Sequence, residues 1–114
     1  GVGSTTADGS YGVGAVISIQ VAFSEVVYVG GLPKLALDSG GTATYDSGAG
    51  TSTLTFTYTV GPIQITPDLD YSSTSALTLS GGVITDAALN AAILTLPAPG
   101  APGSLGANKN IVIS

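Results

Sequence analysis

The sequence lacks cysteine, histidine, methionine and tryptophan. Without cysteine the chain has neither a disulfide framework nor a thiolate metal site. Without histidine or cysteine, with no serine beside a base partner and neither lysine in a recognisable motif, the usual sets of nucleophiles and general bases are empty. We therefore expect that the protein is not an enzyme.

Charge is also scarce. Charged residues make up 8% of the 114 residues, against about a quarter in ordinary globular domains. Seven acidic residues and two lysines give a net charge of −5, which argues against nucleic acid or anionic lipid as a partner and favours cations. No apolar run approaches the roughly 18 residues of a membrane span, and no signal peptide is visible. We expect no membrane insertion, and the start at Gly1 predicts a processed product or a piece of a longer protein.

What the sequence has is alternation, most clearly in TSTLTFTYTV at Thr51–Val60. Its apolar positions, Leu54, Phe56, Tyr58 and Val60, alternate with threonines at every other position. A period of two in β-branched and aromatic residues predicts a half-buried antiparallel strand. The apolar face of such a strand must be covered by a second layer of structure.

Further short segments have the same character. We expect strands at Val16–Phe23, Val26–Val29 (after a break at Ser24–Glu25), Leu35–Leu37, Thr42–Tyr45, Ala76–Leu79, Val83–Ile84, Ile93–Leu96 and Ile111–Ile113. The intervening segments are expected to be a turn-rich entry at Gly1–Gly14, a hairpin loop at Asp46–Gly50, an irregular or edge segment at Ile63–Leu69, a helical turn or loop at Asp86–Ala92, and a flexible or polyproline-like connector at Pro97–Ala107. The pattern predicts an all-β fold: an Ig-like antiparallel β-sandwich of about seven to nine short strands, forming one domain over residues 1–114. An up-and-down barrel is the alternative.

Several strings in this order resemble a bacterial Ig-like or cadherin-like tandem repeat of giant surface adhesins, such as the repeat of the cyanobacterial swimming-motility surface protein. They are DGSYGVG from Asp8, AVISIQVAFSE from Ala15, TATYDSGAGTSTLTFTYTV from Thr42, DLDYSSTSALTLSGG from Asp68 and LTLPAPGAPGSLGANKNIVI from Leu94. The resemblance implies a β-sandwich used in series as a rod, often with Ca²⁺ near module boundaries. The sequence departs from the repeat pattern at three places: Ala15, Gly61-Pro62-Ile63, and Leu89, which stands where glycine is common before Asn90.

Five acidic residues at positions that match the repeat are the candidate Ca²⁺ ligands: Asp8, Glu25, Asp68, Asp70 and Asp86. Carboxylates in turns at strand ends, completed by backbone carbonyls, form the oxygen shell that Ca²⁺ prefers. The alternative interpretation is that these residues are solvated turn residues and Asx caps.

The resemblance and the composition together predict a structural module of an exported bacterial cell-surface protein or extracellular fibre, which acts as a spacer or a self-assembling unit. Neighbouring copies of the same module are its expected partners, and an edge of the sandwich is a candidate for strand addition by such a copy. The alternative function is a polysaccharide-binding module, for which surface glycans are the partners and an exposed cluster of the five tyrosines is the feature to seek.

Overall fold

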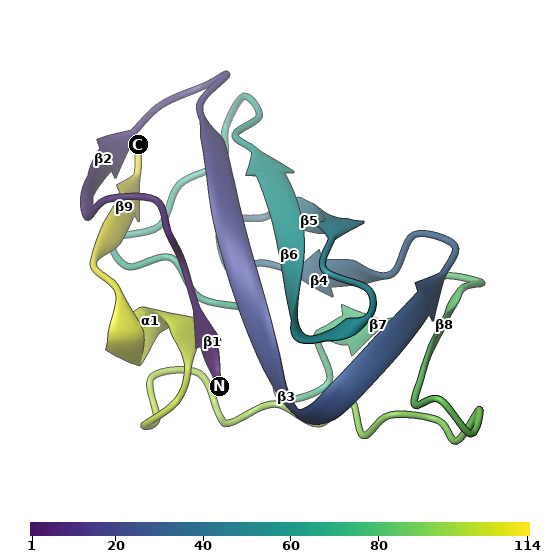
Figure 1. The fold of residues 1–114 in the computed structure, drawn as a ribbon. Helices are drawn as coiled ribbons and strands as arrows, with labels where there is room; N and C mark the ends of the chain where they lie inside the picture. The colour runs from purple at the N-terminus through teal and green to yellow at the C-terminus, as the bar shows by residue number, and fades with distance from the viewer.

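The computed structural model describes all residues from Gly1 to Ser114, which form nine strands and one short helix (Figure 1). The strands are β1 (Val2–Gly3), β2 (Gly9–Tyr11), β3 (Val16–Gly30), β4 (Lys34–Ala36), β5 (Thr42–Ser47), β6 (Thr51–Thr59), β7 (Leu77–Thr78), β8 (Val83–Thr85) and β9 (Ile111–Ile113), and α1 is Leu105–Asn108. Seven of them form a curled antiparallel sheet in the order β1-β3-β6-β5-β4-β7, with β8 paired to β3. β2 and β9 form a separate two-stranded sheet. The predicted all-β sandwich-like fold is thus confirmed.

The centre of the sheet is the pair β3 and β6, which contains the alternating stretch predicted from the sequence. Three cross-strand pairs lie on the inner face and are fully buried: Ile17 with Tyr58, Ile19 with Phe56, and Val21 with Leu54. The threonines of β6 lie on the other face, where they are exposed or half-buried. The predicted pairing of β5 with β6 is also confirmed. Period-two alternation therefore assigns both faces of this sheet correctly.

The predicted break at Ser24–Glu25 is wrong, because β3 runs without interruption from Val16 to Gly30. The register with β6 shifts between Ala22 and Val27. This bulge bends the strand, and Figure 1 shows β3 turning sharply before its second half reaches β8. A polar pair in the middle of an apolar run thus marks a bend in one strand.

The predicted strand Ile93–Leu96 is not formed. Ile93 is 83% exposed, and only Leu96 of this segment is buried. The backbone of the segment is held in part by a bond from the Leu96 N–H to the Thr74 carbonyl, 2.9 Å long. An apolar run with high β propensity becomes a strand only where another strand lies beside it, and here none does.

The segment Pro97–Ala107, predicted to be a flexible or polyproline-like connector, contains two closed turns and most of α1. Ser104 caps the helix by accepting a bond from the Ala107 N–H at 3.1 Å, and both Ser104 and Leu105 are fully buried. With four residues, α1 is the only helix, and no helix here has the length and apolar character needed to cross a bilayer. This tail, with β9 and Leu69 to Tyr71, contributes buried side chains to the core.

Candidate functional site

The second strand of the chain, β2, and the last, β9, pair in parallel. Gly9 is opposite Ile111, and Tyr11 is opposite Ile113. The Gly9 N–H donates to the Asn110 carbonyl at 3.2 Å, and the Ser114 N–H donates to the Tyr11 carbonyl at 3.0 Å. We refer to residues 8–11 and 109–114 together as the terminal clasp. Its parallel pairing departs from the antiparallel pattern expected for the whole sandwich.

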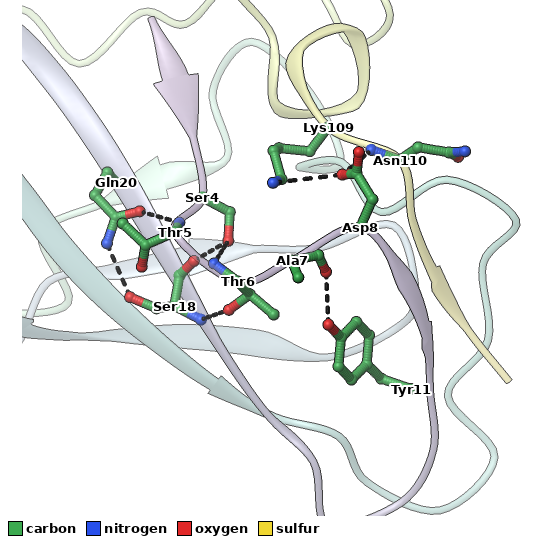
Figure 2. Close-up of polar contacts among 10 residues, drawn as sticks. All are labelled: Ser4, Thr5, Thr6, Ala7, Asp8, Tyr11, Ser18, Gln20, Lys109 and Asn110. Carbon is green, nitrogen blue, oxygen red and sulfur yellow. Dashed lines mark hydrogen bonds and ion pairs between the residues drawn. The ribbon is translucent and has the colours of Figure 1, made fainter.

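Asp8 joins the two segments of the clasp at the end where β2 begins (Figure 2). Its Oδ1 accepts the Asn110 N–H at 2.9 Å and lies 3.4 Å from the Lys109 ammonium. The bond from the Asn110 backbone lowers the pKa of Asp8 below its usual value, and Lys109 acts in the same direction. A lowered folded-state pKa means that Asp8 stabilises the fold above about pH 4 and loses this contribution as the pH falls through the lowered pKa.

The residues between β1 and β2 are fixed to β3 by side chains (Figure 2). The Ser18 N–H donates to Thr6 Oγ1 at 2.9 Å, and the Ser4 hydroxyl donates to the Ser18 carbonyl. The Thr5 N–H donates to Gln20 Oε1, also at 2.9 Å. Hydroxyl and amide groups thus take the place of a partner strand and cover this edge of β3 where β1 has ended.

β1 itself is held from both sides. It pairs with β3, while the Val2 N–H donates to the Gly103 carbonyl at 2.8 Å and the Asn108 amide donates to the Val2 carbonyl at 2.8 Å. The first residues of the chain are therefore attached to the central sheet, to the tail and, through β2, to β9. β9 is attached on its other side to Thr66, by two bonds of 2.9 Å between Thr66 and Ile113.

The five predicted Ca²⁺ ligands do not lie together. Asp8 is in the terminal clasp, Asp68 and Asp70 precede Tyr71, and Glu25 and Asp86 lie at the bend of β3. No group of three or more acidic side chains is placed so that it could hold a metal ion. Calcium binding by these residues accordingly stays a prediction from the resemblance.

Asp86 illustrates the alternative role as a turn cap. Its Oδ1 accepts the N–H groups of Ala88 and Asn90, each at 2.9 Å, and its Oδ2 accepts the Asn90 side-chain amide at 3.1 Å. The bond from the Asn90 backbone is the main cause that lowers the pKa of Asp86. This carboxylate closes the turn after β8 as an Asx cap does.

The resemblance predicts that the melting temperature rises when Ca²⁺ is added and falls when a chelator replaces it, because an ion bound only by the folded state stabilises that state. The measurement is a thermal melt followed by circular dichroism, with Mg²⁺ at the same ionic strength as the control. Identical melting temperatures in Ca²⁺ and in chelator would show that Ca²⁺ does not stabilise this protein.

The tyrosines do not form an exposed cluster. Tyr58 and Tyr71 are fully buried, and the ring of Tyr45 packs edge-on against Phe56. The Tyr71 hydroxyl donates to the Pro97 carbonyl at 2.6 Å, and burial raises the pKa of Tyr71 to about 12. Tyr28 is the most exposed of the tyrosines, at 45%. Polysaccharide binding stays an untested alternative, without the clustered rings that would favour it.

Comparison of the chain with protein-family models, with curated proteins and with solved structures finds no match. The likeness to surface-adhesin repeats therefore rests on the residues quoted above.

The signal for the clasp was present in the sequence but weak. Asp8-Gly9 predicted a turn, and Ile111–Ile113 predicted a closing strand, yet nothing local to either segment indicated that they pair. The pairing joins residues about 100 positions apart, and contacts of that kind follow from the whole fold.

Proposed function

We propose that this chain is a structural module of an exported bacterial cell-surface protein or extracellular fibre, where it acts as a load-bearing spacer between neighbouring copies of itself. The observation that carries the proposal is the parallel pairing of β2 with β9. When the chain is pulled at its two ends, the force reaches β2 only after β1 and residues 4–6 have detached from β3. β2 is then drawn by its N-terminal end and β9 by its C-terminal end, in opposite directions along the strands. All bonds across the pair then resist together.

The position of the two ends supports this use. In Figure 1 both ends of the chain lie on the side of the molecule that contains β1, β2 and β9, away from β8. Force applied at the two ends therefore acts on the part of the molecule that contains the terminal clasp. The scarcity of charge and the hydroxyl-rich outer face of β6 suit close contact between copies.

Two exposed side chains support contact with neighbours. Ile63 is 98% exposed and Leu89 is 82% exposed, and both have a left-handed backbone, with φ of 66° and 68°. A bulky residue in this region costs roughly 1–2 kcal/mol relative to glycine, and an exposed side chain makes no contacts within the chain that offset the cost. Contact with an adjoining module would offset it. Both residues lie where the sequence departs from the repeat pattern.

Single-molecule pulling through handles at Gly1 and Ser114 tests the proposal. We expect Asp8→Ala to unfold several-fold faster at a given force than the wild type, because it removes the Asn110 bond and the Lys109 ion pair from the clasp. The matched control is Asp46→Ala, an exposed acid of β5 that bonds only to its neighbour Ser47. Equal unfolding rates for the two variants would show that the clasp does not bear the load.

A further inference from the structure

The largest cleft of the molecule lies at the bend of β3. It has a volume of about 420 Å³, within the usual range for ligand sites. Its lining mixes apolar and polar groups and comes mostly from three parts of the chain: the N-terminal Gly1 and Val2, β3 between Val21 and Val27, and the segment between Asn90 and Pro97 after β8. Leu77 and Asp86 complete it. Neither the proposed spacer role nor the terminal clasp uses this cleft.

The backbone along one wall of the cleft has no partner strand. β1 pairs with β3 at Gln20 and Val21, and β8 pairs with β3 from Tyr28 to Gly30. On the other side of β3, Ala22 is paired with Thr53 of β6, and the next residue of β3 paired with β6 is Val27. Residues 23–26 of β3 therefore have no opposite residue in any of its three ladders. They form a gap in the sheet edge between β1 and β8.

A gap of this kind fits an extended polypeptide. Four residues of extended chain span roughly 13 Å, and a strand placed there would continue the sheet between β1 and β8. Val21, Phe23 and Leu96 line the cleft, and every second side chain of such a strand would pack against them. A small rigid ligand would use the apolar lining but not the unpaired backbone.

The charge of the cleft indicates which polypeptide fits. Glu25 and Asp86 both line it, no lysine does, and neither acid is in an ion pair. Neither lysine of the chain is suited, because Lys109 is paired with Asp8 and Lys34 lies in β4 between β5 and β7. The complementary occupant is a basic segment of another protein.

We propose that the bend of β3 is a binding site for an extended peptide in which apolar residues alternate with lysine or arginine. The peptide adds a short strand beside residues 23–26, its apolar side chains enter the cleft, and its cations face Glu25 and Asp86. Main-chain bonds supply the affinity, and the two carboxylates supply the preference for basic sequences.

The test uses an acetylated, amidated peptide of alternating valine and lysine, titrated into the isotope-labelled chain and followed by NMR. We expect saturable shifts of the amide resonances of residues 23–26 at millimolar peptide. A peptide of valine and glutamate should not bind, and N-methylation of alternate peptide amides should abolish binding. Absence of binding by the lysine peptide, equal binding by the glutamate peptide, or unimpaired binding by the N-methylated peptide would each overturn the proposal.

Variants of the protein separate the contribution of charge. Glu25→Gln should weaken binding of the lysine peptide about threefold at low salt, the size expected for an exposed ion pair. Asp46→Asn, which removes an equal charge far along the chain on β5, should leave binding unchanged. If both variants weaken binding equally, the peptide is attracted only by the net negative charge of the protein. The proposal that the peptide binds at this cleft is then wrong.

Discussion

Replacing Asp70 by alanine is expected to destabilise the fold by about 3 kcal/mol, measured as the free energy of unfolding in urea. Asp70 is 5% exposed. Its Oδ1 accepts the Tyr71 N–H, and its Oδ2 accepts the Gly100 N–H, each at 2.9 Å. Alanine would leave the N–H of the buried Tyr71 without its partner, and a buried donor without a partner is costly. It would also release the Gly100 N–H, and with it the attachment of the tail.

The position of Asp70 explains why the effect should be large. Its backbone exchanges bonds with Asp38: the Asp38 N–H donates to the Asp70 carbonyl at 2.9 Å, and the Asp70 N–H donates to Asp38 Oδ1 at 3.2 Å. Its carboxylate also lies against Gly106 of α1, where a side-chain carbon would come within 2.6 Å of Oδ2. One residue thus holds the turn after β4, the proline-rich tail and the helix together.

Asp68→Asn is the matched control, because Asp68 lies two residues away and is exposed. Partial desolvation raises the pKa of Asp68, and the charges of Asp70 and Asp8 act in the same direction. Neutralising it should leave stability at pH 7 unchanged or slightly higher. Equal losses for Asp70→Ala and Asp68→Asn would show that Asp70 has no special structural role.

The part of the fold that follows from the sequence is the part built on local alternation. Thr51–Val60 and Val16–Phe23 have a strict period of two over many residues, and one buried face admits only one register. Their inner faces and the hairpin from β5 to β6 were therefore predictable, whereas the pairing of β3 with β6 was not predicted. The same reasoning was wrong for Ile93–Leu96, since a β-prone run needs a neighbouring strand that composition does not reveal.

The tail and the clasp could not be predicted because long-range contacts determine both. Pro97–Ala107 has the composition of a linker, yet the Gly100 N–H is bound to Asp70 and Ser104 caps a buried helical turn. In isolation neither contact is visible. Parallel pairing of β2 with β9 likewise depends on where the whole sheet places the two ends of the chain.

One residue of the sequence, Glu25, indicated the cleft. Along β3 the buried residues Ile17, Ile19, Val21 and Val27 share one phase of the alternation, and Glu25 falls in the same phase. A carboxylate at an inward position indicates that the face opens there to solvent. The sequence analysis interpreted Ser24–Glu25 as a break between strands, whereas the structure has a bulge beside an open cleft.

The predicted two-faced character of β6 is tested most directly by changing neighbouring positions on its opposite faces. Phe56→Ala should lower the free energy of unfolding by about 4 kcal/mol, because the ring is fully buried, packs edge-on to Tyr45 at a centroid distance of 6.1 Å and lies opposite Ile19. Thr53→Ala, on the exposed face of the same strand, should change it by less than about 0.5 kcal/mol.

Both variants should unfold in urea with the wild-type slope, so that the shift of the midpoint reports stability alone. If Phe56→Ala and Thr53→Ala lowered the free energy of unfolding by similar amounts, β6 would have to bury both faces or be displaced in register by one residue. A displacement would move every inward side chain of the strand to the solvent side. Because Ile17, Ile19 and Val21 pack against the same face, the core, the bend of β3 and the cleft beside it all depend on this register.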